Sequence, residues 1–187
     1  MKSFEEVFLS IILGIDPGSY VTGFGLLKAH RDHVEHVSHG VILLPKDQAL
    51  PERLRVLAEG MSELLEKYKP SAVAIEKIFL GKNADSAFKL GHARGVVMSF
   101  AASSGAQVYE YATRVVKKGI AGKGSADKLQ VRDMVQRYLR LSVIERMDAS
   151  DALALALYHA QVSATDQKLQ RGLSPKKPIK HSEGVSL

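Results

Sequence analysis

Four acidic side chains are spaced so that together they could hold a metal ion. Asp16 and Glu76 each follow a short apolar run of the kind that forms a buried strand. Asp148 and Asp151 lie three residues apart at the start of an alanine-rich segment, so on a helix they share one face. A buried carboxylate is costly unless it is paired, hydrogen-bonded, neutralised or bound to a metal.

Repulsion among these carboxylates favours a divalent cation as their common partner. Two like charges about 4 Å apart cost about 4 kcal/mol at an effective dielectric constant of about 20. Hard oxygen ligands suit Mg²⁺ or Mn²⁺, and the sequence has no cysteine for a thiolate zinc site. An alternative stays open for the last pair, because Asp148 could be a helix N-cap and Asp151 a first-turn acid favoured by the helix dipole.

Length and composition limit what surrounds these residues. The chain has 187 residues, 45% of them hydrophobic, which suits one domain with a sizeable core. The absence of cysteine excludes disulfides and fits a reducing compartment. The apolar stretch over residues 7–15 is far shorter than the roughly 20 residues that span a bilayer, and it lacks the flanks of a signal peptide. We expect a cytoplasmic protein with no membrane association.

The net charge of +6 and the sequence pI near 9.5 favour a polyanionic partner. Residues 164–187 hold five basic and two acidic side chains, hence half of the excess, among prolines, glycines and serines without apolar periodicity. We therefore expect a folded domain over residues 1–163 and a basic, disordered tail over residues 164–187.

The pattern of apolar residues predicts an α/β domain. Strands are expected over residues 11–16, 23–29, 33–44, 71–77 and 107–112, the first three as an antiparallel meander. Helices are expected over residues 51–68, 84–103, 125–141 and 148–160, with Ser125 capping the third.

Four histidines, His30, His33, His36 and His39, recur at every third position. On a strand of period two, neighbours at a spacing of three point to opposite faces. We therefore expect these histidines to occupy solvated or edge positions and not to converge on one metal.

Four segments carry a family resemblance. In order, "GIDPGSYVTGFG", "AIEKIFLGKNADSAFKLGHARG", "EYATRVVKKGIAGKGSADKLQV" and "DASDALALAL" resemble the motifs of the RuvC family, the bacterial Holliday-junction resolvases or crossover junction endodeoxyribonucleases. The match spans about residues 11–159 and leaves the first ten residues and the tail unassigned. It implies a ribonuclease-H-like α/β fold, a five-stranded mixed sheet with helices on both faces, for the nuclease domain over residues 1–163.

The resemblance also implies an activity. Asp16, Glu76, Asp148 and Asp151 would be the catalytic, metal-binding tetrad of a Mg²⁺-dependent endonuclease, with two ions per active site and Mn²⁺ able to substitute. The enzyme would act as a homodimer on four-way junction DNA during recombination and repair. The RuvA and RuvB branch-migration proteins would be its partners.

Candidate DNA contacts come from the same motifs. The resemblance points to Lys117 and Lys128, and less directly to Lys82 and Arg94. Phe79 follows the strand that carries Glu76 and could stack on an unpaired base. Alternatively, the basic residues are ordinary surface charges and Phe79 folds back onto the core.

The helix over residues 84–103 is the expected dimer surface. It offers small and apolar side chains for close packing, namely Phe88, Gly91, Gly95, Val96 and Met98. The alternative is that these residues only cover the sheet of their own subunit.

Three other functions deserve comparison. An ATPase of the actin and sugar-kinase type would share a first loop like "GIDPGSYVTGFG", but the chain has no second Asp-x-Gly loop. A module that binds branched DNA without cutting would be expected to lose some of the acids, and all four are present. A related nuclease acting on structured RNA is the nearest enzymatic alternative, and only a substrate panel separates it.

Overall fold

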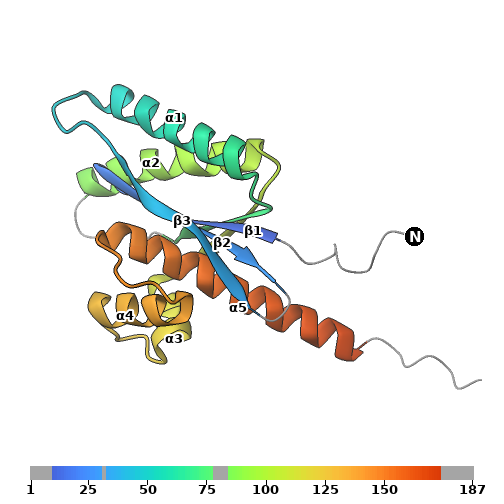
Figure 1. Ribbon diagram of the computed structural model, residues 1–187. Helices are drawn as coiled ribbons and strands as arrows, with labels where there is room; N and C mark the ends of the chain where they lie inside the picture. The colour runs from blue at the N-terminus through green and yellow to red at the C-terminus, as the bar shows by residue number, and fades with distance from the viewer. Residues whose placement is uncertain (1–9, 31–32, 78–83, 174–187) are drawn as a thin grey trace, which may run out of the picture.

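One mixed sheet lies between two layers of helices in the computed structural model, which describes residues 10–30, 33–77 and 84–173 (Figure 1). Its five strands follow the order β3-β2-β1-β4-β5. Their bounds are β1 Ser10–Asp16, β2 Val21–Ala29, β3 Val34–Leu43, β4 Ala72–Glu76 and β5 Gln107–Tyr111. β1, β2 and β3 pair antiparallel, whereas β1, β4 and β5 pair parallel. The predicted meander and mixed sheet are confirmed.

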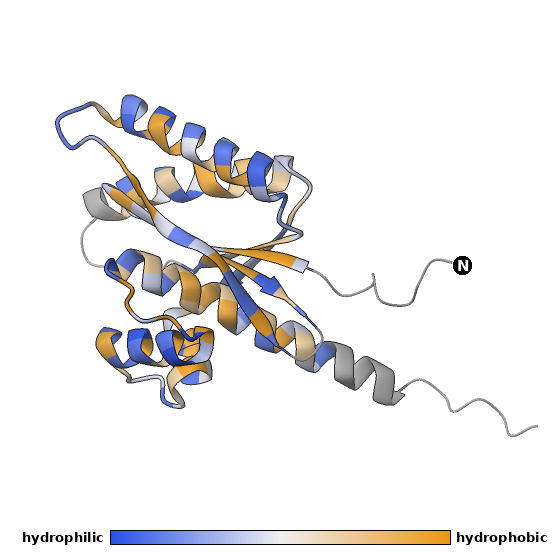
Figure 2. Cartoon of the chain, in the orientation of Figure 1, coloured by the Kyte–Doolittle hydropathy of each residue, from blue (hydrophilic) through white to orange (hydrophobic). Residues whose placement is uncertain are grey.

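Helices cover both faces of this sheet. On one face lie α1, Leu50–Tyr68, and α2, Ala84–Ser103. On the other lies α5, Met147–Leu173, with α3, Thr113–Ala121, and α4, Lys128–Leu139, packed against it (Figure 1). Apolar residues follow the sheet and the helix faces turned toward it (Figure 2). No described helix is long and apolar enough to cross a membrane.

The core is divided in two by the sheet, because successive side chains of a strand point to opposite faces. In β1, Leu13 and Ile15 are fully buried against α1 and α2, whereas Ile12 packs on the α5 side. In β4, Val73 and Ile75 likewise face α1 and α2. The alternate positions of both strands therefore face α5.

Three strand glycines let α5 lie directly on β1 and β2. A Cβ on Gly14 would come within 2.0 Å of the carbonyl oxygen of Ala152, and one on Gly23 within 2.0 Å of the carbonyl oxygen of Asp148. A Cβ on Gly25 would come within 2.7 Å of Leu153 Cγ. The first turns of α5 are thus held against the strands by contacts that any larger side chain would break.

The structure corrects the predicted helices between β5 and α5. α3 was not expected, because residues 113–121 include Thr113, two valines and Gly119, which lower the local helix propensity. α4 begins at Lys128 and not at Ser125, because Asp127 is the N-cap and forms a capping box with Gln130.

α5 is longer than expected. It continues to Leu173, past the boundary placed at residue 163. Residues 174–187 lie outside the described residues, as does the extension over residues 1–9. The division into a domain and a basic tail therefore stays a prediction.

The spaced histidines lie in or beside the edge strand β3, as expected, but the prediction that neighbours at a spacing of three point apart was wrong. His36 Nε2 lies 2.8 Å from His39 Nδ1, and His30 and His33 stack ring on ring. A β-bulge opposite Leu26 and Leu27 puts one extra residue into β3 between these histidines, which brings His36 and His39 to the same side. His30 follows the end of β2 and His33 precedes the start of β3, so the period of a single strand does not apply to them.

Candidate active site

The parallel register of β1 and β4 brings two of the predicted acids together. Ile15 pairs with Ile75, so the next residues, Asp16 and Glu76, stand side by side where the two strands end. Both residues occupy strand positions that face α5. Like-charged neighbours at the ends of parallel strands form a natural site for a cation or for a shared proton.

These acids line a pocket of about 190 Å³ that five elements enclose. Asp151, from the second turn of α5, completes the acidic side of the pocket. Lys117 of α3 and Lys128 of α4 supply its basic side. Asp16, Glu76, Asp151, Lys117 and Lys128, all predicted from the sequence, are therefore brought together by the fold.

The electrostatics of the pocket show how closely the acids crowd. Burial, followed by repulsion from Glu76 and Asp151, raises the pKa of Asp16 to about 8. Burial also raises the pKa of Asp151, although Lys128 opposes that rise. Asp16 therefore keeps its proton at neutral pH. A divalent cation would displace that proton and offset the repulsion between the carboxylates.

Hydrogen bonds fix the side chains around the pocket. Lys128 Nζ donates to Asp151 Oδ2 at 2.7 Å, and this bond raises the pKa of the lysine. Thr113 Oγ1 donates to Glu76. Lys117 Nζ donates to the carbonyl oxygen of Ala126 at 2.8 Å, which ties α3 to the segment that leads into α4.

Asp148 stands apart from the other three acids. Its side chain is 39% exposed and lies 3.7 Å from Arg146 Nη2, and it is not part of the pocket wall. It is nevertheless close enough to Asp151 to raise the pKa of that residue. Within the described residues, no three of the predicted acids bring their oxygens within 4.8 Å of one another.

The donor set fits a hard divalent cation. All the candidate ligands are carboxylate oxygens, and at least three of them line one pocket. Asp16 and Glu76 crowd each other, whereas Lys128 and Arg146 pair with the two acids of α5. A divalent cation, because of its higher charge, would compete with these two basic side chains for the carboxylates.

Arg94 is placed differently from the two lysines. Its guanidinium group donates to the backbone carbonyl oxygen of Glu76 at 3.3 Å and to Met98 Sδ, and it pairs with Glu110. With a side chain only 16% exposed, it braces the end of β4 against α2. The geometry favours this structural role, and a DNA contact by Arg94 stays a prediction.

Two other predicted DNA contacts, Phe79 and Lys82, lie outside the described residues. Conversely, Thr113, which orients Glu76, was not among the site residues predicted from the sequence. Its position two residues after the end of β5 was a usable signal, because residues at the ends of parallel strands share one edge of the sheet.

Acids at the ends of two central parallel strands and on the helix across them define, together with this sheet, a nuclease of the ribonuclease-H-like class. The family profile of crossover junction endodeoxyribonuclease RuvC matches residues 12–159. The chain belongs to the RuvC family.

Individual relatives agree with this assignment. A crossover junction endodeoxyribonuclease RuvC of Bdellovibrio bacteriovorus is 54% identical over 164 residues, which cover 88% of this chain and 98% of the relative. That of Mannheimia succiniciproducens is 43% identical and covers 96% and 89%. The structure of Thermus thermophilus RuvC in complex with a Holliday junction substrate superposes with a TM-score of 0.78 at 31% identity, covering 84% and 96%.

Proposed function

We propose that this protein is a structure-selective endodeoxyribonuclease that resolves Holliday junctions by paired symmetric nicks in recombination and DNA repair. The observation that carries the proposal is the pocket in which Asp16, Glu76 and Asp151 meet two lysines on the scaffold of the RuvC family. A relative of the same fold is described in complex with a Holliday junction substrate.

The proposed reaction is metal-dependent phosphodiester hydrolysis. Two Mg²⁺ ions, replaceable by Mn²⁺, would be held by Asp16, Glu76 and Asp151 with Asp148, one helical turn before Asp151. When bound, such ions activate a water molecule and stabilise the leaving oxygen. The protein contributes the positions: β1 and β4 hold two acids rigidly, and the glycine-lined contact with α5 fixes the other two.

The two lysines have a separate proposed role on the substrate. The Lys128 side chain is 62% exposed although its ammonium group pairs with Asp151, so it can reach both the acids and a phosphate at the mouth of the pocket. Lys117 lines the same pocket. Point charges of this kind position a phosphate backbone without reading sequence.

A second copy of the chain is expected on α2. Phe88 is 71% exposed, and a Cβ added to Gly91 or Gly95 would meet no atom of the described residues within 4 Å beyond the adjacent backbone of its own helix. These glycines are therefore not needed for packing within the subunit. Val96 and Met98, by contrast, are partly buried against the subunit's own core, so only part of the predicted surface is free.

A twofold dimer suits the proposed reaction, because two strands must be cut and each chain supplies one carboxylate pocket of this kind among its described residues. The partnership with RuvA and RuvB and a cytoplasmic location stay predictions from the family resemblance. The alternatives of an ATPase, a non-cleaving module and a nuclease for structured RNA are not favoured, since the relatives are named endodeoxyribonucleases.

A substrate panel tests the proposal. The protein is incubated with a mobile four-way junction, a linear duplex of the same sequence and a structured RNA, each with Mg²⁺ and with a chelator. We expect paired nicks in the junction alone, and only with Mg²⁺. Equal cleavage of the RNA, or cleavage in chelator, would contradict it.

A further inference from the structure

The β2–β3 hairpin brings two histidines opposite each other. The backbone N–H of His30 donates to the carbonyl oxygen of His33 at 2.9 Å, and Ala29 pairs with Val34 just behind them. Cross-strand partners of this kind project from the same face of a hairpin. Glu35 lies two residues beyond His33 along β3 and therefore shares that face.

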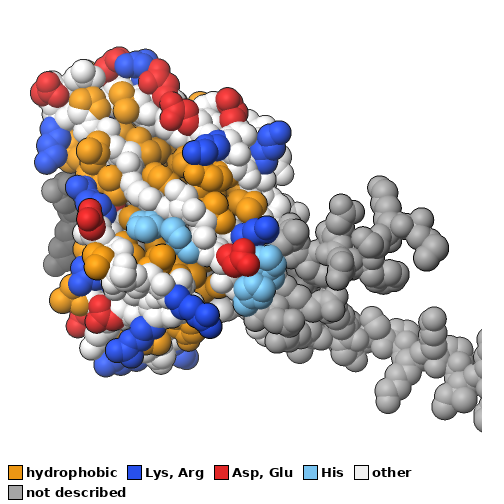
Figure 3. Space-filling view, in the orientation of Figure 1, with side chains coloured by type: hydrophobic (Ala, Val, Ile, Leu, Met, Phe, Trp, Pro, Cys, Tyr) orange, Lys and Arg blue, Asp and Glu red, His pale blue; other side chains and the backbone are white. Residues whose placement is uncertain are grey.

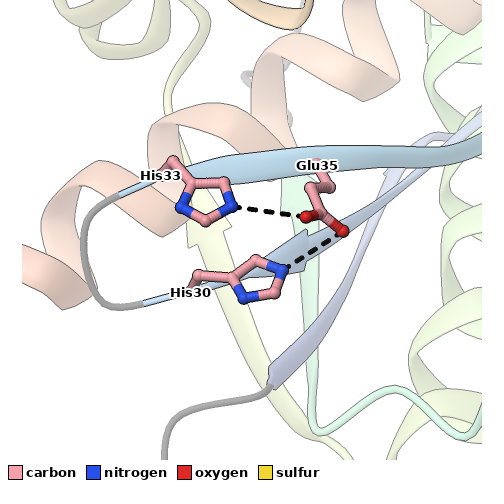
Figure 4. A group of neighbouring side chains, drawn as sticks. All are labelled: His30, His33 and Glu35. Carbon is pink, nitrogen blue, oxygen red and sulfur yellow. Dashed lines mark hydrogen bonds and ion pairs between the residues drawn. The ribbon is translucent and has the colours of Figure 1, made fainter.

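The three side chains converge. His30 Nε2 lies 3.2 Å from one carboxylate oxygen of Glu35, and His33 Nε2 lies 3.3 Å from the other (Figure 4). The two imidazole rings stack with their centroids 4.3 Å apart and their planes within 6°. One nitrogen of each ring and the carboxylate lie within 4.8 Å of one another, the one such group of histidine and acidic residues within the described part of the chain.

We propose that His30, His33 and Glu35 bind a transition-metal ion of the Zn²⁺ class. Two imidazole nitrogens and one carboxylate are a ligand set that zinc and its first-row neighbours prefer, with water completing the coordination. His30 Nε2 is closed off from solvent and faces the Glu35 carboxylate 3.2 Å away, so the nitrogen and the carboxylate are already placed as neighbouring ligands would be. The backbone of the hairpin holds the ligands together beforehand.

This site differs from the carboxylate pocket in position and chemistry. Along the β1–β2 ladder, Asp16 pairs with Gly23 at one end, whereas Ala29, next to His30, pairs with Ser10 at the other. Mg²⁺ prefers oxygen ligands and does not compete for imidazole. The two sites can therefore be occupied independently.

The surroundings indicate what the ion would do. His30, His33 and Glu35 border a groove of about 880 Å³ between the hairpin, the end of α4 and α5. Figure 3 shows that histidines gather in two places on the face drawn. β3 is an edge strand, paired with β2 alone among the described strands. An ion bound to both strands where they meet would hold β3 in register with β2.

Zinc titration of the full chain tests the proposal. Calorimetry is run with excess Mg²⁺, so that the carboxylate pocket is saturated, on the wild type and on His33→Gln, Glu35→Gln and His39→Gln. His39 is the matched control, because it belongs to β3 but contacts His36 instead. We expect the wild type to bind one zinc ion per chain with micromolar or tighter affinity. The affinity should fall about tenfold or more in His33→Gln and Glu35→Gln and stay unchanged in His39→Gln.

Two further readouts keep the test decisive. Zinc should raise the melting temperature of the wild type and of His39→Gln but not of Glu35→Gln, and it should shift the side-chain nitrogen resonances of two histidines. Circular dichroism checks that each variant is folded. Equal zinc affinity in the wild type and His33→Gln, or loss only in His39→Gln, would overturn the site.

Discussion

Lys128 of α4 donates a 2.7 Å hydrogen bond to Asp151 of α5 inside the pocket that Asp16 and Glu76 also line. The ammonium group neutralises part of the acidic cluster and opposes the rise that burial causes in the pKa of both Asp16 and Asp151. The lysine therefore occupies the electrostatic role that a divalent ion would take over, and it would then be released toward the DNA.

Lys128→Ala should separate the two functions of this residue. We expect Mg²⁺ affinity that is unchanged or tighter, because a competing cation is gone, and weaker junction binding with a salt slope reduced by about 1. Titration calorimetry and filter binding at several salt concentrations measure the two effects. Lys67→Ala, on the opposite helix layer, is the control. An unchanged salt slope would mean that Lys128 does not reach the phosphates.

Asp16→Asn should abolish cutting and spare junction binding. The amide keeps the shape of the side chain but removes a charged ligand, and the loss of about 3 kcal/mol of metal-based stabilisation lowers a rate by about a hundredfold or more. Nicking assays and gel shifts on the same junction measure both properties. A clean preparation that keeps more than a tenth of the wild-type rate would refute the assignment of Asp16.

The stability of the metal-free protein should depend on pH through Asp16. The pKa of this residue is about 8 in the folded state against an ordinary value of 3.8, so between these values the folded state binds more protons than the unfolded state. Stability therefore falls as pH rises through that window, and Mg²⁺ should bind more tightly as the proton leaves.

Melting curves in chelator at pH 5, 7 and 9 check this sign by comparing the wild type with Asp16→Asn. The difference between the two isolates Asp16 from other titrating groups, such as His159, whose pKa is lowered by burial. We expect the variant to gain several degrees relative to the wild type from pH 5 to pH 9, at about 2–4 °C per kcal/mol. A constant difference would show that Asp16 ionises normally.

Gly14→Ala should destabilise the protein and disturb the site from a distance. The added methyl group would fall 2.0 Å from the carbonyl oxygen of Ala152, so α5 must move away from β1. Overpacking of this kind costs about 1–3 kcal/mol, and the acids of α5 move with the helix. The free energy of unfolding, measured by denaturant titration, and the Mg²⁺ affinity should both decline. An unaffected Mg²⁺ affinity would show that α5 adjusts without moving Asp151.

Gly95→Leu should disturb the dimer without destabilising the subunit, in contrast to Gly14→Ala. Beyond the adjacent backbone of α2, the described part of the chain has no atom within 4 Å of the added Cβ, and replacing a helical glycine contributes up to about 1 kcal/mol of helix propensity. The subunit should therefore stay at least as stable. Sedimentation at micromolar concentration should nevertheless show a monomer, because the side chain blocks close approach of a second α2. A persistent dimer would place the interface elsewhere.

The sequence by itself determined the local features of this protein. Apolar runs that end in an acid identified β1 with Asp16 and β4 with Glu76, and the helical spacing of its leucines identified α1 to within one residue of its observed bounds. These features depend on neighbours along the chain, which a periodic pattern records. The resemblance to the RuvC family then identified the chemistry, and the matching family profile confirms that membership.

Tertiary structure alone decided which side chains meet. Strand register placed Asp16 beside Glu76, while the rotation of α5 brought Asp151 into the pocket and left Asp148 beside Arg146. A bulge and a hairpin turn brought together histidines that strand periodicity had separated. Each of these outcomes depends on contacts between segments far apart in the chain or on a break in local periodicity, and no spacing within one segment encodes them.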